Sequence, residues 1–155
     1  MGSEMCIRDR ANNGNTALHL AADNNHLNIA EMLLNRGSDI NSKGTDGTAL
    51  HMAAGNNHLN IAEMLLNRGT DINSKDNNGC TALHIAAINN HLNTAEMLLN
   101  RGSDINVEDN NGYTALHLAA RYDHLKIAEM LLNRGSDIHS KNLSLIHISE
   151  PTRPY

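Results

Sequence analysis

Apolar and polar residues follow the same pattern four times along this 155-residue chain. The string Thr-Ala-Leu-His recurs at intervals of 32, 33 and 33 residues, and the string Ala-Glu-Met-Leu-Leu-Asn-Arg-Gly follows each copy at the same distance. A fixed period of this length is typical of proteins built from stacked repeats. The chain therefore predicts one domain over 11–142, with four repeats at 11–43, 44–75, 76–108 and 109–141.

Each repeat predicts two short helices followed by a polar hairpin. In the first repeat, Thr16 is a suitable N-cap residue because its hydroxyl can accept a hydrogen bond from a backbone amide of the first turn. The helix face that follows is formed by Leu18, Ala21 and Ala22. The first helices are expected to end near residues that tolerate a left-handed backbone, namely Asn25, Asn57, Asn90 and Asp123. The second helices are expected to end at Gly37, Gly69, Gly102 and Gly135.

The second helix of each repeat carries a longer apolar stripe, formed in the first repeat by Ile29, Leu33 and Leu34. Asn28 lies three residues before Glu31, and this spacing, which recurs in the second and third repeats, predicts a capping box at the start of the helix. Thr94 stands where the other repeats have isoleucine, so the third layer is a predicted weak point.

A single repeat of this kind cannot bury both helix faces, but stacked neighbours can share a continuous apolar core. The chain has three Tyr and no Phe or Trp, so Leu, Ile, Met and Ala must fill the space between thin layers. We therefore expect an all-α solenoid of four helix-turn-helix units joined by hairpin loops. The second hairpin lacks one residue after Gly47 and should differ from the others. Neither end has a polar capping repeat, so we also expect exposed apolar end faces and end-to-end self-association.

A longer pattern of fixed residues can be followed through each repeat. In the last repeat its members are Asp109, Gly112, Thr114, Leu116, His117, Ala119, Ala120, His124, Leu131, Leu132, Gly135 and Asp137. The pattern resembles the ankyrin repeat over 11–142, although alanine replaces the family's proline at the first helical position and Asn or Asp replaces its glycine between the helices. The resemblance implies a non-catalytic module that binds another protein through its hairpin tips and the concave face of its first helices.

The two ends of the chain break the repeat. Gly2–Arg10 and Leu143–Pro151 can be encoded by the complementary strands of one DNA sequence, which resembles a transposon-based sequencing-library adapter. We therefore expect 1–10 and 143–155 to be non-native tails, and 11–142 to be a window from a longer ankyrin-repeat protein. The alternative is a pair of unrelated disordered tails.

Charge and motifs exclude several classes of function. The net charge of −5 gives no basic field that would attract nucleic acid or an anionic membrane. No metal-binding, phosphate-binding or catalytic motif is present, so we expect no metal, no cofactor and no enzyme activity. Cys80 lacks an obvious base or cationic partner and is interpreted as an exposed, unspecialised thiol. As the one cysteine outside the tails, it favours a reducing, intracellular compartment.

Histidines occur as pairs seven residues apart in every repeat, beginning with His19 and His26. Because the pair recurs in each layer, we interpret it as structural, with the imidazoles linking hairpin backbone to helix start by hydrogen bonds. Imidazoles at interior positions predict that the array loses stability as they become charged at about pH 6.

Positions that differ between repeats are the candidates for partner contact, since positions that serve the stack recur. The candidate partner-binding residues are Asn15, Asp23, Asn24, Cys80, Ile88, Asn89, Tyr113, Arg121 and Tyr122. An exposed Ile88 beside Tyr113, Arg121 and Tyr122 has the composition of a binding hot spot. The alternative is neutral drift at unconstrained surface sites. We therefore expect a protein-binding scaffold or, as the alternative, a targeting or regulatory segment of a larger enzyme or channel.

Overall fold

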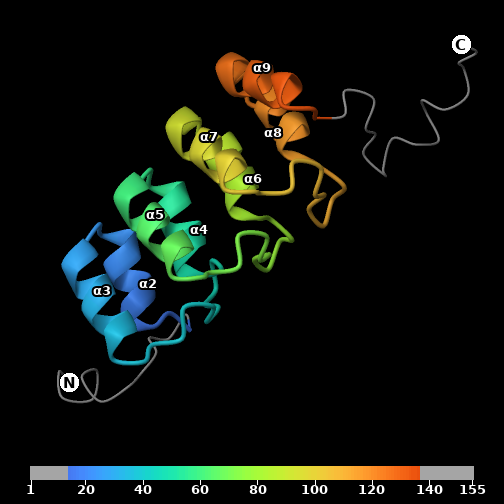
Figure 1. The fold of residues 1–155 in the computed structure, drawn as a ribbon. Helices are drawn as coiled ribbons and strands as arrows, with labels where there is room; N and C mark the ends of the chain where they lie inside the picture. Colours follow the sequence, from blue (N-terminus) through green and yellow to red (C-terminus); the bar gives the residue numbers. More distant parts are fainter. Residues whose placement is uncertain (1–13, 137–155) are drawn as a thin grey trace, which may run out of the picture.

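The computed structural model describes residues 14–136 and shows four helix pairs stacked in series (Figure 1). The helices are α2 (Ala17–Asp23), α3 (Leu27–Asn35), α4 (Ala49–Gly55), α5 (Leu59–Asn67), α6 (Ala82–Ile88), α7 (Leu92–Asn100), α8 (Ala115–Arg121) and α9 (Leu125–Asn133). Within 14–136 there is no strand, and one isolated bridge joins Gly44 to Gly47. The predicted all-α solenoid is therefore confirmed, whereas the adapter-like tails at 1–10 and 143–155 lie outside the described residues.

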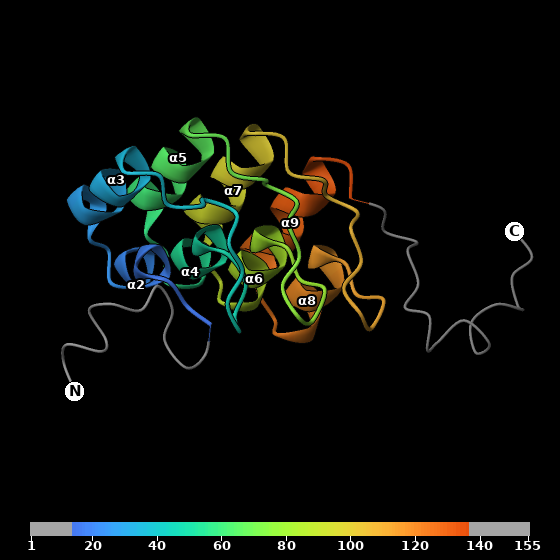
Figure 2. The same cartoon turned by 90° about the horizontal axis from the view of Figure 1, so that it is seen from below.

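The helices form two layers (Figure 2). The first helices α2, α4, α6 and α8 make one layer, and the second helices α3, α5, α7 and α9 make the other. Each first helix packs against the second helix of its own repeat and against the first helix of the next repeat. Every repeat therefore contacts only its neighbours, as expected of a solenoid.

The first helices begin and end as the sequence predicts. Thr81 is the N-cap of α6, where its hydroxyl accepts a hydrogen bond from the His84 amide at 3.4 Å. The residue after each C-cap has a left-handed backbone, with φ of 63°, 60°, 61° and 62° at Asn25, Asn57, Asn90 and Asp123.

The predicted capping box of the second helices is wrong. These helices begin one residue before Asn28, Asn60 and Asn93, so a histidine occupies the N-cap position and makes no side-chain capping bond. The capping box instead lies at the first helices, where His84 is the third helical residue and its Nδ1 accepts a hydrogen bond from the Thr81 amide at 3.0 Å. Imidazole thereby takes the role that Glu or Gln usually has in this motif.

The core is a continuous layer of Leu, Ile, Met and Ala between the helix pairs. Leu50, Ile61 and Leu65 are at most 1 % exposed, and the Ala-Ala pairs of the first helices are buried in the first three repeats. Thr94 is also fully buried, and its hydroxyl donates a hydrogen bond to Oδ1 of Asn57 at 2.7 Å. The substitution in the third layer thus has a satisfied polar group, and reduced stability of that layer stays a prediction.

The second hairpin differs from the others, as its missing residue predicts. In the third repeat, the carboxylate of Asp76 accepts hydrogen bonds from the amides of Asn78 and Cys80, and Asp109 has the same role in the fourth. In the second repeat, Gly44 and Gly47 instead pair with each other through two backbone hydrogen bonds of 2.9 and 3.3 Å. Gly47 has a φ of 101°, and a Cβ there would lie 2.6 Å from Nδ1 of His51, so this turn requires glycine.

Candidate protein-binding surface

Residues that vary between repeats lie in two parallel rows where the first helices end. We call the last residues of these helices the variable row; they are Asp23, Gly55, Ile88 and Arg121. We call the C-cap residues that follow them the cap row; they are Asn24, Asn56, Asn89 and Tyr122. Asp23, Arg121 and the whole cap row are exposed, while Ile88 is half-buried rather than exposed as predicted. Both rows cross all four repeats.

Arg121 contacts two tyrosines in the last repeat. Its guanidinium carbon lies 5.7 Å from the ring centre of Tyr113 and 5.9 Å from that of Tyr122, within the range of a cation–π interaction. Nη1 of Arg121 also donates a hydrogen bond to the Tyr113 hydroxyl at 3.2 Å. Among residues 14–136, no carboxylate forms an ion pair with Arg121. The Arg121 cluster, meaning these three residues, is an ordered cation whose charge has no anionic partner in the described chain.

The three asparagines of the cap row share one conformation. In Asn24, Asn56 and Asn89 the side-chain amide donates to the backbone carbonyl four residues earlier, at 2.9, 3.1 and 3.0 Å. Asn56 additionally donates to Oδ1 of Asp23 at 2.6 Å, which links the first two repeats. Since each amide nitrogen is turned to its own helix, the side-chain oxygen is the group left to accept a hydrogen bond from outside.

Two predicted partner-binding residues are not at the surface. Asn15 is 7 % exposed and Cys80 is 6 % exposed, and the Cys80 carbonyl contacts Nε2 of His51 in the preceding repeat. The interpretation of Cys80 as an exposed thiol is therefore wrong. The pKa of the Cys80 thiol is raised to about 12, first by burial and then by the negative charges of Asp76 and Asp109. Tyr113, at the same hairpin position of the fourth repeat, is half-buried and keeps its hydroxyl against Arg121.

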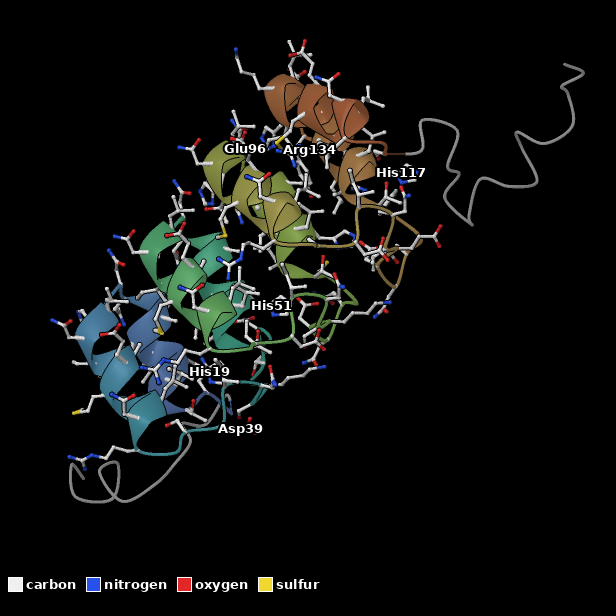
Figure 3. All side chains as sticks on the ribbon, viewed as in Figure 1. His19, Asp39, His51, Glu96, His117 and Arg134 are labelled. Atoms are coloured by element: carbon white, nitrogen blue, oxygen red, sulfur yellow. The ribbon has the colours of Figure 1, made fainter. Side chains whose placement is uncertain are left out.

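In the first three repeats, the first histidine links the helix start to the next hairpin, which confirms its structural interpretation there. Nε2 of His19, His51 and His84 lies 2.9, 2.8 and 3.0 Å from the backbone carbonyl of Gly47, Cys80 and Tyr113 respectively. Nδ1 of the same ring accepts from the backbone amide of the N-cap threonine, so the proton of the neutral imidazole is on Nε2, which donates to the carbonyl. Figure 3 labels His19 and His51, together with His117, the first histidine of the fourth repeat.

The second histidine of each repeat makes a different contact from the one predicted. Nδ1 of His58, His91 and His124 lies 3.0, 2.9 and 2.8 Å from a backbone carbonyl near the end of the first helix of the preceding repeat. These three rings are half-buried, and His26, with no preceding repeat among the described residues, is exposed. Among residues 14–136, the buried histidines are therefore His19, His51 and His84, each the first of its pair.

Acid is expected to destabilise the array through His51 and His84. Desolvation by burial lowers the pKa of both imidazoles from the ordinary value of 6.5, against smaller opposing effects that include the carbonyl hydrogen bonds. Below pH 6.5 the unfolded chain binds protons that the folded chain does not, so the free energy of unfolding should fall as pH decreases from 6.5 toward the lowered pKa values.

Urea unfolding midpoints measured between pH 8 and pH 5 test this expectation. A midpoint that stays level throughout would contradict it. The variant His84→Gln should have a smaller slope of stability against pH than the unchanged protein, because it removes one of the two buried imidazoles whose pKa is lowered.

Two features are absent from the described residues. Between Gly14 and Ser136 no three His, Cys, Asp or Glu side chains lie close enough to hold a metal ion. Across the same stretch no helix has the length and apolar character needed to cross a membrane. The exposed variable and cap rows can supply apolar contact, hydrogen-bond acceptors and charge, which are the elements of a binding surface.

The stacked helix pairs and projecting hairpins define a helical repeat protein of the solenoid class. A family model described as "Ankyrin repeats (3 copies)" matches residues 50–142, and one described as "Ankyrin repeat" matches residues 13–45. The chain therefore belongs to the ankyrin repeat family. Members of this family are generally protein-interaction modules and are typically non-catalytic. A search of curated proteins finds no match to the chain.

One contact of this surface involves a residue outside the predicted partner-binding set. Asn56 is not in that set, although Asn24 and Asn89 are, yet Asn56 donates a hydrogen bond to Asp23. The sequence carries a signal for this contact, namely an acidic residue in one repeat beside an amide in the next.

Proposed function

We propose that the chain is a non-catalytic module that binds a protein partner through the first-helix side of repeats three and four. The observation that carries this proposal is the Arg121 cluster, in which two aromatic rings contact a cation that forms no ion pair with a carboxylate of residues 14–136. Tyrosine and arginine are the residue types that dominate binding energy at interfaces. A side chain already ordered before binding loses less conformational entropy in the complex.

Ile88 and Asn89 extend this surface into the third repeat. Ile88 is half-buried, so part of its side chain remains available for apolar contact beside the exposed Asn89. Tyr122 is 47 % exposed and stacks on His124, with ring centres 6.2 Å apart. The surface thus combines an aromatic and apolar centre with a polar surround, which is the usual anatomy of a protein interface.

Replacing Tyr113 and Tyr122 by alanine should weaken binding about 30-fold, which corresponds to the loss of about 2 kcal/mol typical of hot-spot residues. Peptides selected from a random phage-display library against the unchanged protein serve as the ligand, and fluorescence anisotropy gives the dissociation constant. The alanine variants keep the backbone carbonyl of Tyr113 that binds His84, so folding should be retained.

The matched control replaces Asn35 and Asn67, which are exposed residues at the ends of α3 and α5 in the other layer. This pair of changes should leave binding unaltered. Peptides that bind the tyrosine-free variant as tightly as the unchanged protein would refute the proposed surface.

A second candidate function is end-to-end self-association, favoured by a specific pattern of exposure. Ile29 and Met32 of α3 are 47 % and 48 % exposed, whereas their equivalents Ile61 and Met64 of α5 are 0 % and 8 % exposed. At the other end, Leu125 and Leu132 of α9 are 66 % and 40 % exposed. The two ends therefore present the two halves of the interface that already joins neighbouring repeats within the chain. The same faces would accept further repeats of a longer ankyrin protein.

Two complementary variants test this self-association. Ile29→Glu should block one face and Leu125→Glu the other, because each places a charge in a contact that must exclude water. Sedimentation velocity should then show monomers for each variant alone and a dimer for their equimolar mixture, which retains one intact pair of faces. A monomeric unchanged protein at millimolar concentration would exclude association between copies.

A further inference from the structure

The variable row changes its chemistry from one end of the array to the other. It begins with the carboxylate of Asp23, passes Gly55 and the apolar Ile88, and ends with the guanidinium of Arg121. Neither Asp23 nor Arg121 forms an ion pair with any residue of 14–136. Two exposed charges of opposite sign thus lie three repeats apart on one continuous surface, with an apolar position between them.

We infer that this surface recognises an extended peptide segment that carries a basic residue, an apolar residue and an acidic residue in that order along the array from Asp23 to Arg121. The inference rests on the proposed function, since it concerns the same surface, and it adds the chemistry and orientation of the partner. Complementary charge placed along an interface fixes register and excludes wrong partners more than it adds raw affinity.

The Arg121 cluster supplies the end that receives the acidic residue. A guanidinium has five N–H donors, and the hydrogen bond to the Tyr113 hydroxyl uses one of them. The remaining donors can bind a carboxylate at two points, which is the geometry arginine favours. Contacts with both tyrosine rings restrict the side chain, so the cation is in position before the ligand arrives.

The carboxylate of Asp23 supplies the opposite end. One of its oxygens accepts the hydrogen bond from Asn56, which orders the side chain without neutralising its charge. Gly55 follows in the row and places no side chain between Asp23 and Ile88. The side-chain oxygens of Asn24, Asn56 and Asn89 run parallel to this path and can accept hydrogen bonds from the backbone amides of an extended chain.

The helix spacing sets the spacing of the expected peptide. Neighbouring packed helices lie about 9 Å apart, and an extended chain advances about 3.3 Å per residue. One repeat therefore corresponds to about three peptide residues. Along the array, the basic and apolar residues should be about six positions apart, and the acidic residue should lie about three positions beyond the apolar one. The peptide chain can run in either direction along this path.

Selection of random twelve-residue peptides on phage tests this inference, using the full chain and the charge-exchanged variant that combines Asp23→Arg with Arg121→Glu. The variant keeps the net charge of the chain, so general electrostatic attraction is unchanged. Peptides selected on the unchanged protein should carry the acidic residue about three positions and the basic residue about six positions from the apolar residue, and peptides selected on the variant should carry the two charges exchanged. Each set should bind the other protein about tenfold more weakly. The matched control exchanges the charges of two exposed residues in the other layer, Glu63 of α5 and its C-cap residue Arg68. This control should select the same peptides as the unchanged protein.

The outcomes separate the two levels of the proposal. Peptides that depend on Tyr113 and Tyr122 but show no charge order, or the same order on both proteins, would overturn the inferred polarity and leave the binding surface standing. Failure to select any peptide that depends on the two tyrosines would overturn the proposed surface and the polarity together.

Discussion

Replacing His84 by alanine is expected to lower the free energy of unfolding by about 3 kcal/mol, because the change leaves buried backbone groups without hydrogen-bond partners. His84 is 1 % exposed, and its ring contacts the amide and hydroxyl of Thr81 and the carbonyl of Tyr113. Removing the ring breaks the capping box of α6 and the link to the next hairpin in one step. Water has little access to the groups left behind, so it cannot replace the lost contacts.

The same substitution at His26 is the matched control. His26 is exposed, and none of the described residues offers it the carbonyl contact made by His58, His91 and His124. His26→Ala should therefore change stability by less than about 0.5 kcal/mol, as surface substitutions usually do. Urea unfolding followed by circular dichroism gives both values. Equal effects of the two substitutions would show that the imidazole of His84 does not link the repeats.

The second large effect is the chemical protection of Cys80. Its thiol pKa is raised from 9.0 to about 12, first by burial and then by the charges of Asp76 and Asp109. At pH 8 the thiolate fraction in the folded protein should therefore be about a thousandfold lower than in the unfolded chain. Because the thiolate is the reactive form, alkylation by iodoacetamide should slow by about the same factor.

The experiment uses the Cys6→Ser background, so that Cys80 is the only thiol in the chain. Alkylation is followed by mass spectrometry in buffer and in concentrated urea. Reaction in buffer within tenfold of the urea rate would mean that the hairpin opens often or that the thiol is not buried. The His51→Ala variant is an informative comparison, because it removes the imidazole that holds the Cys80 carbonyl and should speed alkylation.

Much of the fold follows from local sequence because each repeat specifies the same contacts. Thr16 and its equivalents were recognisable as N-caps, and the left-handed residues after the first helices were recognisable as Asn or Asp. The helical spacing of Leu18, Ala21 and Ala22 correctly predicted the buried face of the first helix. These features depend on residues close in sequence, where spacing alone determines which groups meet.

Contacts between repeats were harder to predict. The start of the second helices was misplaced because Asn28 and Glu31 have a capping-box spacing, whereas each helix begins directly after a histidine whose backbone amide donates to a carbonyl of the first helix of its own repeat. The burial of Cys80 was missed because hairpin residues are usually exposed, and here the Cys80 carbonyl contacts His51 in the first helix of the preceding repeat. That contact comes from 29 residues away in sequence.

The histidine links also determine where this array can change its sequence. Each histidine hydrogen-bonds a backbone carbonyl of the hairpin and makes no use of the side chain at that position. The carbonyls of Gly47, Cys80 and Tyr113 are the three examples. Even the second repeat, whose hairpin is one residue shorter, provides a backbone carbonyl for the imidazole of His19. Outside the second hairpin, whose turn requires Gly47, substitutions at this position can therefore accumulate and alter binding specificity while the stacked architecture stays intact.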